Sequence, residues 1–478
     1  MKFPRLIGLL SLLAAQSFAE GLPDLGEAAQ ATLSVQQERR VGESIMQQIH
    51  ADPAYLDDPE LTEYLNNLGY RLVSNSPDNQ RDFEFFLVQD RTLNAFALPG
   101  GFIGVNTGLI QAAQSESELA GVLAHEIAHV TQHHLSRMLA GTQQSTLTSM
   151  AALAVAILAA RSNPEVAQAA IATAQAASIQ SQLNFTREHE READRIGFQI
   201  LQQSGFDTRG MASFFERLQK FGRLYDNDAP AYLRTHPLTT ERIADIENRV
   251  ASAPYRQVPD NLEFQMLRAK LRSAQDTPEQ AVAAFEEMLR ERTGNPLAAH
   301  YGLVLGLQRT GNRQRAEQEL AALRKAAPPQ AMIENLSAQL AMTNGQAGTA
   351  LERYLTALKR FPHHRALIYG YAETLLQNRQ APEATTFLDK QLQTRPTDYH
   401  LYQLQAKSYA AQGKTLLQHK AQAEAYARSG NISGAIEQLQ LAQKSEDGDF
   451  YQQSIVEARL RELRAIDMET RKKRDSPN

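Results

Sequence analysis

The C-terminal half of the chain repeats itself at a fixed interval of 34 residues. Three positions follow this interval independently: a proline, a site that is glycine in three of four copies, and an alanine (Pro328, Pro362 and Pro396; Gly311, Gly345, Arg379 and Gly413; Ala316, Ala350 and Ala384). Short repeated units of this kind each form one helix pair, which cannot bury its apolar face alone. The period therefore predicts a stack of helix pairs in this half of the chain.

The order of the three positions within the unit is that of a tetratricopeptide repeat, with Gly between two helices, Ala inside the second helix and Pro after it. Arg379 is the one departure. Residues 269–296 resemble a looser copy, another begins at Tyr402, and residues 432–444 and 451–466 are expected to be capping helices. We assign residues 262–466 to a tetratricopeptide domain and 467–478 to a polar tail. Because repeat units contact their neighbours, we expect this domain to be separable from the preceding one.

A second feature is the pentapeptide His125-Glu126-Ile127-Ala128-His129. It lies in a predicted helix that starts at Ser115, with Glu118 as the partner in a capping box. Residues four apart lie on one face of a helix, so both imidazoles can bind one metal ion while Glu126 faces the reacting water. The sequence thus predicts a zinc peptidase with His125 and His129 as metal ligands and Glu126 as general base.

The third ligand is expected downstream, because the spacing after His129 is wrong for a third histidine of the metzincin kind. His133 and His134 are expected to face solvent or to support the ligands. Residues 187–195 offer three glutamates, and helix geometry alone cannot choose among them. We prefer Glu190, because Asp194 one turn later can orient ligands. For Glu188 and Glu192 the alternative is surface ion pairs with Arg187, Arg191 and Arg195.

These motifs resemble the HtpX-like and CAAX-prenyl-protease-like zinc peptidase family. The resemblance covers most of residues 30–250 and includes residues 98–101, 106–109, 235–237 and 241–243. It implies one zinc ion per chain, with Glu190 as the third ligand and Asp194 as the acid behind the ligands. Together with the repeats, it implies a periplasmic branch that controls the quality of outer-membrane proteins.

His236 is held in Thr235-His236-Pro237, where proline stiffens the loop. Three interpretations remain open for it. It is a loop or capping residue, a donor to the oxyanion, or a fourth zinc ligand that keeps the resting protease closed.

The N-terminus is typical of an exported protein. Lys2 and Arg5 precede a short apolar run and Ser17-Phe18-Ala19, so we expect a signal peptide at 1–19 that is cleaved after Ala19. The mature protein is then expected in a bacterial periplasm. The chain has no cysteine, which excludes thiolate catalysis and a disulfide framework. Its net charge of −5 gives no indication of nucleic-acid binding.

The fold class is expected to be mainly α, with a helical zincin-type metallopeptidase domain at residues 20–255. Apolar residues recur at helical spacing from about residue 32 to 72, and short runs between 82 and 110 predict a small antiparallel sheet. Residues 101–106 are either an edge strand that binds an extended substrate or an interior strand. Residues 140–182 are expected to form a buried helix or a lid, and peripheral membrane contact is the less favoured alternative.

Two functional hypotheses follow. The first is a periplasmic zinc endopeptidase that cleaves misfolded or stalled outer-membrane proteins and has a chaperone-like role. The second is mainly a tetratricopeptide adaptor or chaperone with little proteolysis. In both hypotheses the repeats bind the outer-membrane assembly machinery.

Overall fold

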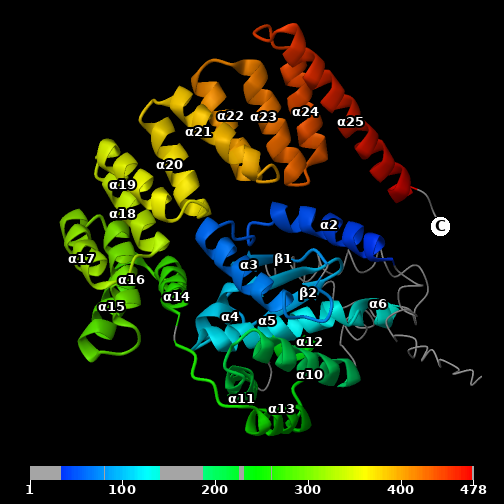
Figure 1. The fold of residues 1–478 in the computed structure, drawn as a ribbon, viewed down its shortest axis with the longest axis vertical. Helices are drawn as coiled ribbons and strands as arrows, with labels where there is room; N and C mark the ends of the chain where they lie inside the picture. Colours follow the sequence, from blue (N-terminus) through cyan, green and yellow to red (C-terminus); the bar gives the residue numbers. More distant parts are fainter. Residues whose placement is uncertain (1–33, 80, 140–186, 225–230, 260, 476–478) are drawn as a thin grey trace, which may run out of the picture.

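The computed structural model describes residues 34–79, 81–139, 187–224, 231–259 and 261–475. A mainly helical N-terminal half carries one small sheet, and an arch of helix pairs follows it (Figure 1). The N-terminal half contains α2 (Val35–Ala51), α3 (Pro59–Val73), β1 (Glu84–Val88), β2 (Ala95–Leu98), β3 (Phe102–Asn106), α4 (Thr107–Ala112), α5 (Glu116–Thr131), α6 (His134–Leu139), α10 (Arg187–Gln203), α11 (Arg209–Leu224), α12 (Ala231–Thr235) and α13 (Thr240–Ser252).

The arch contains α14 (Leu262–Gln275), α15 (Pro278–Glu291), α16 (Pro296–Arg309), α17 (Arg313–Ala326), α18 (Ala331–Thr343), α19 (Ala347–Arg360), α20 (Arg365–Gln377), α21 (Ala381–Thr394), α22 (Tyr399–Ala411), α23 (Thr415–Arg428), α24 (Ile432–Gln443) and α25 (Phe450–Asp475). The capping helices expected from the sequence are α24 and α25. Helix α25 includes residues 467–475, which the sequence analysis assigned to the polar tail.

The sheet is mixed, so the prediction of an antiparallel sheet is wrong. Its strand order is β1-β3-β2, with β3 parallel to β1 and antiparallel to β2. The chain passes from β1 to β2 at the far edge of the sheet and returns through β3 in the middle, where β3 runs in the same direction as β1. Strand β3 is therefore the interior strand, which confirms the second of the two alternatives for residues 101–106 and excludes the first.

Strand β2 forms one edge of the sheet. The N–H of Asn106 donates to the carbonyl of Asn94 across the ladder (3.0 Å). Because hydrogen-bonded and non-hydrogen-bonded pairs alternate in an antiparallel ladder, Ala95 and Ala97 direct their backbone groups away from β3. The opposite edge, β1, is covered by the segment before α3, where the N–H of Leu56 donates to the carbonyl of Leu87 (3.0 Å).

Helix α5 runs through the centre of the N-terminal half and is buried along almost its whole length. It begins as expected, because the Ser115 hydroxyl accepts from the N–H of Glu118. In a capping box the Glu118 carboxylate would accept from the N–H of Ser115. Here it accepts from the N–H of the preceding residue, Gln114 (2.7 Å). Helix α10 lies directly against α5 at Gly197, where an added Cβ would come within 3.0 Å of the His125 Cα.

The turn between the two helices of each repeat explains the single departure from the 34-residue pattern. Gly311, Gly345 and Gly413 adopt positive φ values of 75°, 77° and 69°. Arg379 occupies the equivalent turn with the same left-handed conformation, at φ 59°. The backbone thus keeps the repeat geometry although arginine is less favourable there than glycine.

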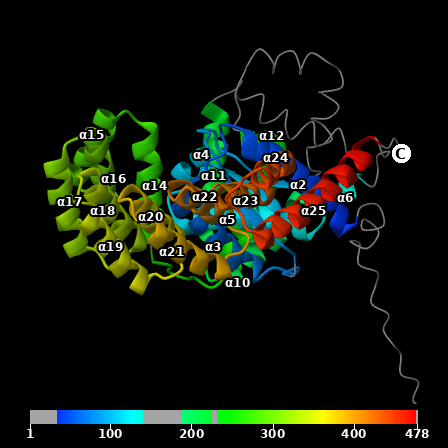
Figure 2. The ribbon, with the colours of Figure 1, turned by 90° about the horizontal axis from the view of Figure 1, so that it is seen from above.

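The arch curves back over the N-terminal half, so its inner side faces α2 and α3 (Figures 1 and 2). The repeat units contact the N-terminal half as well as their neighbours, which the sequence analysis did not expect. Apolar residues of α14, α16 and α18 belong to one buried cluster with residues of α3 and α5. The start of α3 adds polar contacts, because Lys270 binds Asp58 and Glu60, Asn335 donates to Glu60 (2.8 Å), and Asp57 accepts from Tyr399 and His400.

None of the helices in the described ranges is long and apolar enough to cross a membrane. The expected signal peptide and the expected helices within 140–182 lie outside the described residues.

We predict that Glu263 makes the contact between the two halves sensitive to pH. Burial, followed by the charges of Glu63, Glu116 and Glu60, raises the pKa of Glu263 from 4.5 to about 7. Folding therefore favours the protonated carboxyl. Its contribution to stability is complete below pH 4.5 and is lost as the pH rises through about 7.

Replacing Glu263 with Gln should remove this loss. In urea unfolding, Glu263→Gln should gain about 2 kcal/mol over the wild type at pH 8 and much less at pH 5. Glu279→Gln, at an exposed glutamate in the first turn of α15, is the control and should change little at either pH. A gain for Glu263→Gln that is equal at both pH values would contradict the prediction.

Candidate metal centre

Helix α5 positions the three residues of the pentapeptide as the sequence analysis expects. His125, Glu126 and His129 lie in its C-terminal half and are all buried. The Nε2 atoms of the two imidazoles are 3.0 Å apart. Burial lowers the pKa of His129 well below its usual value, so this imidazole is neutral, the form that binds metal ions.

Glu190 comes to the two histidines from α10. Its carboxylate lies 3.4 Å from His129 Nε2 through Oε1 and 3.5 Å from His125 Nε2 through Oε2. Of the three glutamates left open by the sequence, only Glu190 reaches these imidazoles. Glu188 is exposed. The alternative for Glu192 was an ion pair with a neighbouring arginine of α10. Glu192 does form an ion pair, but its partner is Arg137 (2.7 Å).

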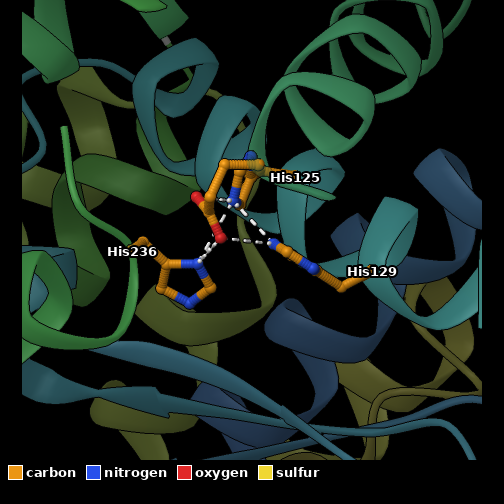
Figure 3. A group of neighbouring side chains, drawn as sticks. His125, His129 and His236 are labelled. Atoms are coloured by element: carbon orange, nitrogen blue, oxygen red, sulfur yellow. Dashed lines mark hydrogen bonds and ion pairs between the residues drawn. The ribbon is translucent and has the colours of Figure 1, made fainter. Parts of the chain in front are cut away.

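His236 completes the group from the loop that follows α12, and Figure 3 shows the three imidazoles converging on one point. Its Nδ1 atom lies 3.0 Å from Glu190 Oε1 and 3.4 Å from His125 Nε2. The ring is buried and stacks on Tyr232, with 4.6 Å between the centroids. One atom from each of His125, His129, Glu190 and His236 lies within 4.8 Å of the others.

The residues of this group fit a bound metal ion. Imidazole and carboxylate are ligands that suit zinc, whose bonds to nitrogen measure about 2.0–2.1 Å. In a tetrahedral site, such bonds separate neighbouring ligand atoms by about 3.3 Å. The distances of 3.0 to 3.5 Å within the group are close to this value.

The Glu126 carboxylate lies beside the group. Both of its oxygens are buried, and no group in the described part of the chain hydrogen-bonds to either of them. His236 Nε2 lies 3.6 Å from Glu126 Oε1. A buried carboxylate without donors is costly, so this arrangement is typical of a group that needs a reactant as its partner.

Asp194 lies behind His125, one turn after Glu190 on α10. Its Oδ1 lies 2.9 Å from His125 Nδ1, and the Arg242 guanidinium donates to both of its oxygens at 2.6 and 2.8 Å. Burial would raise the pKa of Asp194, but the bonds from Arg242 and His125 lower it below its usual value. An ionised Asp194 keeps the proton of His125 on Nδ1 and leaves Nε2 free for the metal.

His134 gives equivalent support to His129. Its buried ring places Nδ1 at 2.8 Å from His129 Nδ1 and Nε2 at 3.1 Å from the Glu192 carboxylate. His133 points elsewhere and contacts Arg81 at 2.9 Å. The two histidines after the pentapeptide thus have different surroundings, and His134 is the one that orients a residue of the group.

Arg242 is the functional residue that the sequence analysis missed, although it lies in a segment that resembles the family. Besides Asp194, it binds Glu190 Oε2 at 2.7 Å and the carbonyl of Pro237 at 2.8 Å. A signal was present in the sequence. Helix α13 buries Ile243 and Ile246, and Arg242 falls on that same apolar face, where an arginine needs an acidic partner.

We predict that Arg242 stabilises the whole centre, because it neutralises two buried carboxylates. Arg242→Met should lower the free energy of unfolding by about 3–5 kcal/mol and weaken metal binding. Arg249→Met on the same helix is the control. It breaks a half-exposed pair with Asp245 and should cost less than about 1 kcal/mol. Equal urea midpoints for the two variants would disprove this role for Arg242.

Comparison with known proteins agrees with this geometry. The sequence model of Peptidase family M48 matches residues 59–250, and that of the Tetratricopeptide repeat matches residues 341–408. The Beta-barrel assembly-enhancing protease of Escherichia coli (strain K12) is 33% identical over 451 residues, which cover 94% of this chain and 92% of that protein. A Putative beta-barrel assembly-enhancing protease of Vibrio cholerae is 34% identical over 454 residues, covering 94% and 93%.

A more distant relative matches a smaller part of the chain. The Mitochondrial metalloendopeptidase OMA1 of Schizosaccharomyces pombe is 31% identical over 193 residues, which cover 40% of this chain and 54% of that protein. The similarity thus extends over nearly the whole chain in the bacterial relatives and over less than half of it in the mitochondrial one. The chain belongs to Peptidase family M48, the metallopeptidases, and to its branch that carries tetratricopeptide repeats.

Proposed function

We propose that this chain is an exported zinc endopeptidase that acts on outer-membrane proteins during their assembly. The observation that carries the proposal is the convergence of His125, His129 and Glu190 beside the Glu126 carboxylate, which is buried and has no hydrogen-bond donor among the described residues. This is the arrangement that hydrolysis of an amide by an activated water requires.

His125, His129 and Glu190 are the proposed ligands of one zinc ion per chain. Zinc bound there would supply a Lewis acid that makes water acidic near neutral pH and polarises the peptide carbonyl. Glu126 would take a proton from the attacking water and deliver it to the leaving amine. Asp194 contributes by fixing the orientation and the protonated nitrogen of His125.

His236 is proposed as a fourth ligand in the resting enzyme. Its Nδ1 stands at ligand spacing from both Glu190 and His125, which favours this role over that of oxyanion donor or loop residue. A fourth protein ligand would occupy the position that water needs. The resting enzyme would then be inactive until its substrate or partner displaces the Thr235-His236-Pro237 loop.

The substrate is proposed to bind as an extended strand along β2. Ala95 and Ala97 direct their backbone groups outward from this edge, and β2 lies against α5. Main-chain hydrogen bonds would hold the chain across the metal centre and give little sequence selectivity. Such binding suits unfolded or stalled proteins, in which extended segments are accessible.

The site of action is proposed from the expected signal peptide and from the names of the relatives. Two of them are described as beta-barrel assembly-enhancing proteases, so misassembled outer-membrane proteins are the proposed substrates and a periplasmic location follows. The repeats offer a surface for the assembly machinery. In the alternative, an adaptor with little proteolysis, a Glu126→Gln chain would fully replace the wild type in cells.

We predict that Glu126→Gln abolishes hydrolysis and keeps the metal, because only the base is lost. The rate of casein cleavage by the purified protein should fall by at least ~10²-fold while the zinc content stays at one per chain. Glu188→Gln, at an exposed position of α10, should cleave at the wild-type rate. Wild-type cleavage by Glu126→Gln would refute the mechanism.

We predict that His236→Ala increases unregulated cleavage, including self-cleavage, because it removes the ligand that closes the site. X-ray absorption should show one imidazole fewer around zinc in the resting variant. His419→Ala in α23 is the control and should match the wild type. Slower hydrolysis with unchanged coordination would assign His236 to the oxyanion instead, and no change in either would leave a structural role.

A further inference from the structure

We propose that the hydroxyl of Tyr232 donates a hydrogen bond to the carbonyl oxygen of the peptide bond that is cleaved. This inference rests on the proposed function and adds a catalytic residue to it. Tyr232 would keep its proton throughout, and its contribution would be to stabilise the negative charge that develops on that oxygen.

The first argument is the state of the hydroxyl. Tyr232 is 1% exposed, and among the residues that the structure describes none hydrogen-bonds to its hydroxyl oxygen. A buried hydroxyl without a partner is destabilising, and phenylalanine would fill the same space without that cost. Such a group therefore calls for a functional explanation.

The second argument is its position. The Tyr232 ring stacks on His236 and lies 6.3 Å from the His125 ring, centroid to centroid. A tyrosine hydroxyl ordinarily keeps its proton at neutral pH, so the phenol beside the metal centre is available as a donor.

The third argument is its relation to the proposed substrate. The N–H of Tyr232 donates to the carbonyl of Leu93 at 3.1 Å. Leu93 lies two residues before Ala95, so its backbone groups point to the same outer side of β2 as those of Ala95 and Ala97. Tyr232 thus stands at the end of the edge along which the substrate would lie, between that edge and the metal centre.

Purely structural packing makes the opposite prediction, and Tyr232→Phe separates the two. If the hydroxyl is catalytic, kcat should fall by about 10²-fold, as for the loss of one oxyanion donor. KM and zinc content should stay within about twofold of the wild type, because a donor used only in the transition state does not affect them. The unfolding temperature should stay equal or rise, because a buried unpaired hydroxyl is removed.

A binding measurement provides a readout that does not depend on turnover. A phosphinic peptide mimics the tetrahedral transition state, so Tyr232→Phe should weaken its binding by a factor similar to the loss in kcat. Binding of the corresponding cleavage-product peptide should not change. Tyr354→Phe is the matched control, because its buried hydroxyl already donates to Asn335 (3.3 Å) in the arch. It should lose stability and keep full activity.

Tyr232 also touches His236, so its substitution is to be repeated in the His236→Ala background. A direct donor should give the same loss of kcat there, whereas an effect transmitted through His236 should vanish. Wild-type kcat in Tyr232→Phe, or loss of the effect in the double variant, would overturn the proposal. Either result, combined with an inactive Glu126→Gln, would leave the proposed function intact.

Discussion

The close contact of α10 with α5 at Gly197 is the constraint on which the metal centre depends. A side chain at this position would meet the backbone of His125. Glu190, Asp194 and Gly197 lie on the same face of α10, because Asp194 follows Glu190 by four residues and Gly197 follows Asp194 by three. The contact at Gly197 therefore sets how far both carboxylates reach towards His125, and an alanine there would require the backbone at His125 to shift.

Around this contact the protein buries charged and polar side chains, which would destabilise an apolar core. Two imidazoles, the carboxylate proposed as a metal ligand and the one proposed as general base share one buried region. Arg242 offsets part of the cost by pairing with Asp194 and Glu190, and a bound cation would offset more. Folding and metal binding are coupled here, because each acidic group needs a positive partner that the apolar surroundings do not supply.

The tetratricopeptide arch is part of the same body rather than an appendage. Its first helices share the apolar core of the peptidase half, and the acidic start of α3 binds side chains from α14, α18 and α22. A partner that bends the arch would therefore act on α3, which packs against α5. This continuity gives the repeats a mechanical connection to the helix that carries the pentapeptide.

The sequence by itself determined the local features of this protein. The spacing of His125 and His129, the capped helix around them, and the 34-residue period all follow from helix geometry, which depends on residues close in the chain. Even Arg379, where the pattern breaks, adopts the turn that the period requires. The family could be recognised for the same reason, since its motifs are short and contiguous.

Only the tertiary structure decided what depends on residues far apart in the chain. The parallel pairing of β1 with β3, the placement of Glu190 beside both histidines of α5, and the approach of His236 all bring together segments whose separation no local pattern specifies. The role of Arg242 was not predicted because recognising a buried ion pair requires knowing both partners. Its partner Asp194 lies on another helix, far away in the sequence. Helix periodicity fixes which face a residue occupies, but packing alone fixes what that face meets.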